Sequence, residues 1–320
     1  MTIAHRLAGA GLTALLAMTF VVDAGAQSAT TPATAPALSL VVLGSGGPGA
    51  TGRAGSSYLV LVDGTPRILV DAGPGSFARL GEAKLSLAKV DVVLLTHLHI
   101  DHVGELPGLF KARAVSSNGP IRFKVFGPDA RKGSGEDASF PSTTRFVDLL
   151  FGPDGAFGYL REFSAPMTIE PTDVPAALRP DVAPTKVYAD GDLVISAIAG
   201  HHRDAPAVIY RIDHAGKSVT FSGDIDAEGL ADLRRIARGT SLLVFNSVVL
   251  DPPGSPATLY TLHTPPKAIG EVADDAQAGK LLLGHLSPAI DKARDAVEAS
   301  IARRYKGAVV FAADGLHVEP

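Results

Sequence analysis

The sequence contains no cysteine among its 320 residues, and this absence restricts its chemistry. No disulfide and no thiolate metal site can form, so any metal ligand must offer nitrogen or oxygen. Attachment of a lipid at a lipobox cysteine is excluded as well. The chain also lacks an excess of basic residues: its net charge is −4. This balance argues against a protein that grips a phosphate backbone, because such proteins carry a basic surface.

Long apolar runs are missing too, except near the N-terminus. His5 and Arg6 precede an apolar run over residues 7–22, which is shorter than the roughly 20 residues that span a membrane. Ala24-Gly25-Ala26 follows in the pattern of a signal-peptidase site. A membrane anchor is the alternative interpretation. We predict a signal peptide over residues 1–26, cleaved near Ala26, a periplasmic or secreted protein, and no membrane partner.

The remaining chain is interpreted as a short spacer and one domain. Residues 27–37 are rich in Ala, Thr and Pro, which predicts a flexible spacer. Over residues 38–320, strands come early and helices are interspersed, as is typical of an α/β sandwich of sheets covered by helices. Residues 129–190 hold 6 Lys/Arg against 10 Asp/Glu, and we expect them to form an acidic insertion on that domain.

One short motif carries most of the chemistry. The run His97-Leu98-His99-Ile100-Asp101-His102 follows an apolar strand predicted over residues 90–95. Two histidines at i and i+2 after a strand can converge on one metal, and Asp101 and His102 can hold a second. Imidazole and carboxylate ligands without thiols suit zinc, manganese or iron. A chance polar cluster on a surface loop is the alternative, but three histidines and an aspartate within six residues favour a metal site.

At this point the sequence resembles the metallo-β-lactamase superfamily, over residues 38–311. The run from Thr96 to Gly104 matches the signature T-H-x-H-x-D-H-x-G. Three further stretches match in the same order: Leu69 to Gly73, whose Asp71 is expected to support a ligand, Phe221 to Asp224, and Leu283 to Ser287. The resemblance implies an αββα sandwich, with two mixed β-sheets flanked by helices.

The resemblance also implies a set of metal ligands for two ions. The first ion would take His97, His99, His201 and Asp224, and the second Asp101, His102, Asp224 and His285. His201 and His202 both follow a predicted strand, and counting back from Pro206 favours His201. Zinc is the expected metal, with manganese or iron as alternatives. Two such cations activate a hydroxide for attack on an electrophile, and Asp101 can orient it.

Further features resemble the ribonuclease Z and arylsulfatase-like branch of that superfamily. They are the Gly44 to Pro48 run, Arg53, and His263 before a predicted helix. The branch implies that His263 acts near the leaving group, as a general acid or a phosphate contact; a surface histidine at a helix start is the alternative. Asn246 to Val249 stands where the ribonuclease has His-Glu-Ala-Thr, and the acidic insertion would repel a phosphate backbone.

These observations predict a secreted dinuclear zinc hydrolase of a small-molecule ester, a phosphodiester or a sulfate ester. A β-lactam or lactone hydrolase is the alternative enzyme, and a non-catalytic metal- or ligand-binding protein is the alternative from another class. Transfer-RNA 3′ processing is rejected, and no nucleic-acid partner is expected. The oligomeric state stays open, with a homodimer as one option.

Overall fold

The computed structural model of the protein describes residues 35–49, 51–133, 138–203 and 205–320. The predicted signal peptide over residues 1–26 lies outside the described residues, as does most of the predicted spacer. Residues 35–320 form one compact unit. Within the described residues, no helix has both the length and the apolar character needed to cross a membrane.

Two seven-stranded sheets make up the centre of this unit. The first has the strand order β14 (His317–Val318), β1 (Leu38–Gly44), β2 (Ser57–Val62), β3 (Thr65–Val70), β4 (Val92–Leu94), β5 (Ile121–Pro128) and β6 (Met167–Val174). The second has the order β13 (Ala308–Phe311), β12 (Lys280–Gly284), β11 (Leu242–Asn246), β10 (Lys217–Phe221), β9 (Ala205–His214), β8 (Leu193–His202) and β7 (Thr185–Asp190).

Each sheet has an antiparallel part and a parallel part. Strands β14 to β3 pair antiparallel and β3 to β6 pair parallel. In the second sheet, β7 to β10 pair antiparallel and β10 to β13 pair parallel. Because the carboxyl ends of parallel strands meet at one edge, the loops after β10, β11 and β12 lie together. The prediction of two mixed sheets is confirmed.

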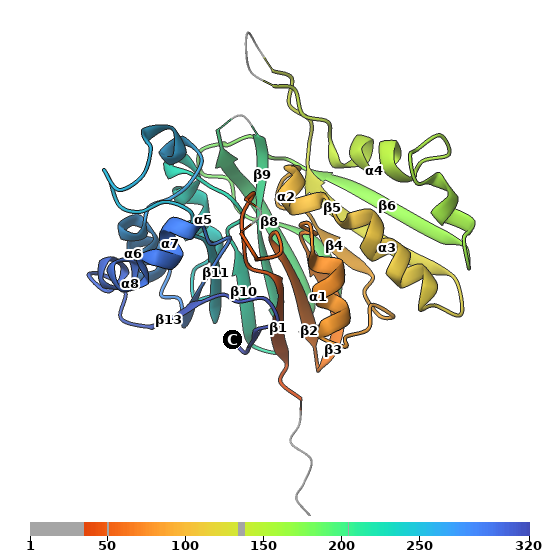
Figure 1. Cartoon of the computed structure of the whole chain (residues 1–320), viewed down its shortest axis with the longest axis horizontal. Coiled ribbons are helices and arrows are strands. Elements are labelled where there is room, and N and C mark those ends of the chain that lie inside the picture. Colours follow the sequence, from red (N-terminus) through yellow and green to blue (C-terminus); the bar gives the residue numbers. More distant parts are fainter. Residues whose placement is uncertain (1–34, 50, 134–137, 204) are drawn as a thin grey trace, which may run out of the picture. The chain divides into compact units, whose positions relative to one another are not determined.

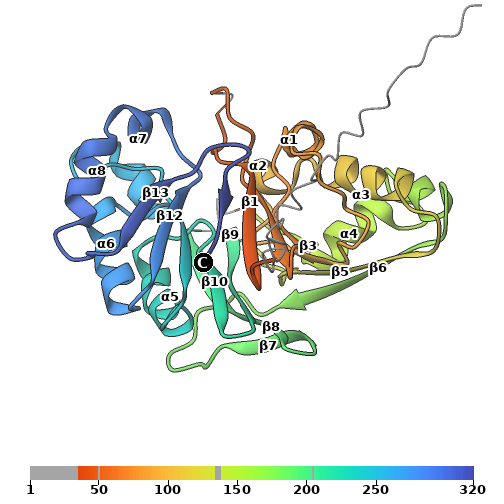
Figure 2. The ribbon, with the colours of Figure 1, turned by 90° about the horizontal axis from the view of Figure 1, so that it is seen from below.

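Helices cover the outer face of each sheet (Figure 1). The first sheet carries α1 (Ser76–Glu82), α2 (Ile100–Val103), α3 (Leu106–Val115), α4 (Thr143–Phe151) and the 3-10 helix η1 (Gly158–Glu162). The second half adds η2 (Ala227–Gly229), α5 (Leu230–Ile236), η3 (Ala257–Thr261), α6 (Pro266–Asp275), α7 (Pro288–Lys292) and α8 (Arg294–Ile301). Figure 2 shows α3 and α4 outside the first sheet and α6 and α8 outside the second.

The hydrophobic core follows this αββα layering. Alternate side chains of β1 illustrate it: Leu40 and Val42 pack between the sheets, whereas Val41 and Leu43 pack under the helices of the first sheet. A strand that is buried on both faces has no polar alternation, and for this reason residues 40–43 of β1 form a continuous apolar run. The apolar strand before His97 is buried in the same way, which fixes the start of the motif loop.

The predicted insertion over residues 129–190 is more closely integrated than expected. It contains the helices α4 and η1, but it also supplies β6 to the first sheet and β7 to the second. The sequence did not predict either strand. Each lies at the edge of its sheet and is half-exposed, and Pro171 and charged residues break the apolar pattern, as is common on edge strands.

Candidate metal centre

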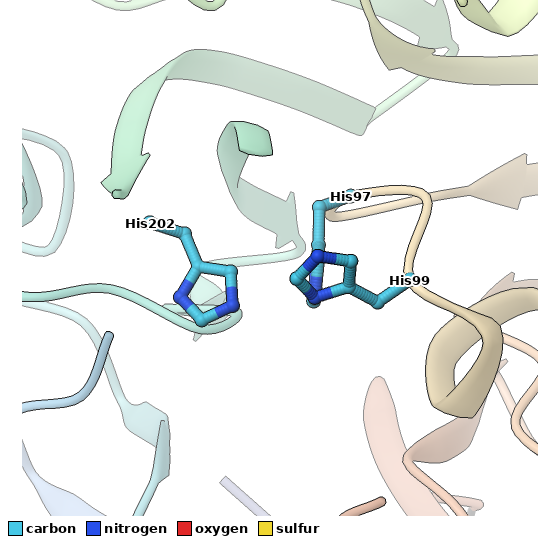
Figure 3. A group of neighbouring side chains, drawn as sticks. All are labelled: His97, His99 and His202. Carbon is cyan, nitrogen blue, oxygen red and sulfur yellow. The ribbon is translucent and has the colours of Figure 1, made fainter. Parts of the chain in front are cut away.

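The motif loop begins where β4 ends and turns at once into α2. His99 has an extended backbone (φ −68°, ψ 148°) directly before that helix. His97 and His99, two residues apart, bring Nε2 of one to 3.1 Å from Nδ1 of the other (Figure 3). Two nitrogens that bind one zinc at about 2.0–2.1 Å in tetrahedral geometry lie about 3.4 Å apart. This spacing therefore suits a shared cation. Asp101 and His102 lie in the first turn of α2.

His102 is held by Asp71, which follows β3. Nδ1 of His102 lies 2.8 Å from Oδ2 of Asp71, and Thr96 donates to both oxygens of that carboxylate, through its backbone N–H and its hydroxyl. Because a carboxylate oxygen accepts this hydrogen bond, Nδ1 carries a proton, and Nε2 is the ring atom that faces Asp101 and Asp224. That Nε2 atom is buried and has no hydrogen-bond partner. Such a carboxylate–histidine pair is the usual support of a metal-binding histidine.

The structure corrects the choice between His201 and His202. His202 joins His97 and His99 in a group whose ligand atoms all lie within 4.8 Å of one another (Figure 3). Its Nδ1 lies 2.8 Å from the Leu262 carbonyl oxygen, which leaves Nε2 free to face the group. His201 instead places Nδ1 2.8 Å from Asp226, beside η2.

The prediction of His201 was wrong for a geometric reason. The count back from Pro206 followed the spacing of a resembling motif, and Pro206 lies opposite His201 in the β8–β9 pair. A count along the chain gives a position but not the face of β8 to which the side chain at that position points, and neighbouring residues of a strand point to opposite faces. The count therefore selected His201, whereas the side chain of its neighbour His202 reaches the centre.

Asp224 lies between the two halves of the cluster. Its Oδ2 is 3.4 Å from Nε2 of His285, 3.6 Å from Nε2 of His102, and 3.8 Å from both Nε2 of His202 and Nδ1 of His263. Its other oxygen, Oδ1, accepts a hydrogen bond from Nδ2 of Asn246 at 2.6 Å. One oxygen of Asp224 is thus held by the protein and the other faces the histidines.

In the sequence, Asn246 is visible only as a departure from the ribonuclease pattern, and its contact with Asp224 is not. The signal that could have found it is positional. Asn246 ends β11, which pairs parallel with β10, the strand before Asp224, so the two side chains belong to the same edge.

The remaining predicted residues belong to three further groups of ligand atoms. Asp101, His102 and His285 form one, with 3.1 Å between Oδ2 of Asp101 and Nε2 of His285. Asp224 belongs to a group with His97 and His102 and to another with His202 and His263. The structure thus brings together every predicted site residue except His201, and it adds His202.

The charges of the cluster favour a cation. Burial lowers the pKa of His97, His99 and His202, so these rings are neutral and can offer lone pairs. Burial also acts to lower the pKa of His102, but Asp71 and Asp224 outweigh it and raise that pKa well above its ordinary value. A site that attracts a proton so strongly, and leaves Nε2 of His102 without a partner, fits a divalent metal ion.

Asp101 and His263 also have pKa values that their surroundings shift. Burial raises the pKa of Asp101, but its hydrogen bond to His285 and the charge of His102 outweigh that effect and lower it, so Asp101 is ionised at neutral pH. Burial lowers the pKa of His263 to about 4, so its ring is neutral at pH 7. His263 can therefore accept or donate a hydrogen bond, but it holds no ready proton as an imidazolium. A cavity of about 350 Å³ opens beside these residues.

Comparisons with known proteins agree with this geometry. A sequence profile of the Metallo-beta-lactamase superfamily matches residues 50–261. A protein named ribonuclease Z from Mycobacterium sp. (strain KMS) is 28% identical over 271 residues, which cover 81% of this chain and 87% of the relative. The fold is shared with the Bacillus subtilis metallo-beta-lactamase fold protein YhfI (21% identity, TM-score 0.63, 88% and 99% covered). It is also shared with the short form of human tRNase Z (18% identity, TM-score 0.64, 88% and 98% covered).

Proposed function

Since the chain belongs to the metallo-beta-lactamase superfamily, we propose that it is a dinuclear zinc hydrolase of a small ester, a phosphodiester or a sulfate ester. The observation that carries this proposal is the position of Asp224 Oδ2 between two groups of ligand atoms. His97, His99 and His202 would hold one ion, and Asp101, His102 and His285 the other, with Asp224 between them. Manganese and iron remain alternative metals, because the set contains only nitrogen and oxygen donors.

Two bound cations would supply Lewis acidity and activate water at neutral pH. The chain's own residues do the rest. Asp101, ionised at neutral pH, can accept a proton from the attacking water and keep it oriented. His263 is buried beside Asp224, and its Nδ1 has no hydrogen-bond partner, so its neutral ring can contact the ester oxygen on the leaving side. Asp71 and Asn246 keep His102 and Asp224 in place.

RNA is the second candidate substrate, and the name of the relatives favours it. The curated relatives are called ribonuclease Z, which leans against the expectation that no nucleic acid is bound. The charge of the chain favours a small ester instead. Residues 129–190 hold 6 Lys/Arg against 10 Asp/Glu, and the whole chain carries −4. Such a surface gives no general attraction to a phosphate backbone.

Metal analysis and a substrate panel test the proposal. Elemental analysis of the purified protein should find about two zinc ions per chain. Hydrolysis is then measured with bis-p-nitrophenyl phosphate, p-nitrophenyl sulfate, a lactone, nitrocefin and a transfer-RNA precursor with a 3′ extension. His99→Ala should lose metal and activity, whereas His317→Ala, at an exposed histidine on β14, should keep both. A protein without metal, or equal activity in the two variants, would overturn the proposal. Activity on the RNA alone would favour the second candidate.

Export is a separate part of the proposal and rests on the predicted signal peptide. Intact-mass measurement of the protein recovered from the periplasm or medium should give a mature chain that begins at Gln27. A chain that starts at Met1 and stays with the cytoplasmic fraction would contradict export without affecting the proposed chemistry.

A further inference from the structure

The cavity beside the candidate metal centre has two unlike parts. Its floor consists of candidate ligands and His263, all polar. The side chains that form its walls are mainly apolar. They come from the loops after β1, β11 and β12, from η3 and the residue after it, and from the start of α7. They are Pro48, Val248, Leu259, Leu262, Leu286 and Pro288.

Apart from the hydroxyl of Thr51, the walls offer little to a charged or strongly polar group. No lysine or arginine lines this cavity among the residues that the structure describes, and its charged side chains are Asp101 and Asp224. The hydroxyl of Ser287 is already engaged, because it donates to the Val248 carbonyl at 2.6 Å and accepts from the Ile290 N–H. A buried polar group without a partner costs binding free energy, so a sugar or a second phosphate would be disfavoured here.

An aromatic ring, outside the cavity lining, packs beside His99. The ring of Phe140 lies 5.8 Å from that of His99, between ring centroids. The cavity volume of about 350 Å³ lies at the lower end of the roughly 300–1,000 Å³ found for ligand sites. The space therefore suits one compact group and not an extended chain.

We propose, building on the proposed function, that the substrate carries a compact, uncharged apolar group, an aryl ring or a short branched alkyl chain, next to the scissile ester. This group would pack against Leu259 and Leu262, while the ester lies over the polar floor. The walls would then select by hydrophobic contact, since the described residues that line the cavity include no lysine or arginine to bind an anionic extension of the substrate.

A matched pair of chromogenic substrates tests the selection. p-Nitrophenyl phenylphosphonate and the p-nitrophenyl ester of thymidine 5′-phosphate have the same leaving group and one negative charge each. They differ in the group that remains on phosphorus. The zinc-loaded protein should hydrolyse the phenyl compound with at least about tenfold higher kcat/KM, as expected for burial of one ring.

A pair of leucine variants tests whether the walls cause this preference. Leu259→Gln should bring the kcat/KM ratio of the two substrates close to one. Leu149→Gln, at a leucine of α4 that is 47% exposed, should leave the ratio unchanged. Equal or faster hydrolysis of the nucleoside ester, or an unchanged ratio in Leu259→Gln, would overturn the inference and leave the proposed function in place.

A binding experiment separates the inference from catalysis. Phenylphosphonate and methylphosphonate present the same anionic head, and calorimetry on the zinc-loaded protein compares their affinities. We expect phenylphosphonate to bind at least about tenfold more tightly, and Leu259→Gln to remove that difference. This outcome without hydrolysis of any substrate would support the apolar site and reject the proposed function. Equal affinities would reject the apolar site.

Discussion

The two sheets contribute to the candidate centre in different ways. The first sheet supplies four side chains from a single loop of six residues, His97 to His102, and their supporting aspartate follows the neighbouring strand β3. The second half supplies four side chains from separate segments: His202 at the end of β8, Asp224 after β10, His263 before α6 and His285 after β12.

This difference separates local from long-range assembly. The four side chains of the first half lie within six residues between β4 and α2, so local backbone geometry is enough to place them close together. The four side chains of the second half come together only when β8, β10 and β12 are paired correctly in their sheet. Asp224 is the link between the two halves, because its Oδ2 lies within 3.8 Å of histidines from both. Variants should therefore have effects that depend on the half they touch, and most of all on the link.

Removal of the link should have the largest effect. In Asp224→Ala, two groups of buried histidines lose the carboxylate between them, so we expect metal content to fall to at most one ion per chain. Hydrolysis should fall by at least about 100-fold, the scale on which single electrostatic groups act in catalysis. Elemental analysis and initial rates measure both quantities, and circular dichroism checks the fold. A variant that keeps two ions and its activity would show that the halves do not share Asp224.

Adjacent histidines provide the next test, within the second half. His202→Ala should lose the first ion and about 100-fold in rate. His201→Ala removes the same side chain one residue away, and its rate should stay within about threefold, which is less than about 1 kcal/mol. Metal titration followed by fluorescence of a competing chelator compares the two proteins. The reverse result would return the role to His201 and contradict the geometry of β8.

The same comparison explains what the sequence could predict. The contiguous motif after β4 identified four residues because local spacing alone determines their chemistry. Asp224 and His285 were predicted through resemblance and order, since each follows an apolar strand. The side to which His202 points and the contact of Asn246 depend on strand pairing across the second sheet, which no local pattern encodes. Edge strands β6 and β7 were missed for a related reason: their exposed, charged residues carry no alternation.

Loss of support in the first half should have a smaller effect than loss of a ligand. Asp71→Asn keeps a hydrogen-bond acceptor for His102 but removes the negative charge that raises the pKa of His102. We expect metal affinity to fall about 10–100-fold, as for other partners of metal-binding histidines. Chelator competition at pH 7 measures this, with Asp295→Asn at an exposed residue of α8 as control. Affinity equal to that of the unmodified protein would mean that Thr96 and the loop alone position His102.

The support in the second half should matter least. Asn246 holds Oδ1 of Asp224 through one hydrogen bond, whereas Asp71 is part of a network of three contacts. Asn246→Leu keeps the volume but removes the donor, and Oδ1 is left buried without a partner. A hydrogen bond to a charged group is worth about 1.5–3 kcal/mol, and a metal that pulls Asp224 into place recovers part of it, so we expect about a tenfold loss of metal affinity. Asn118→Leu, in an exposed loop, is the matched control. If Asn246→Leu weakened metal binding more than Asp71→Asn did, the second half would depend on its supporting residue more than the first half does. The expected ranking of the two supporting residues would then be wrong.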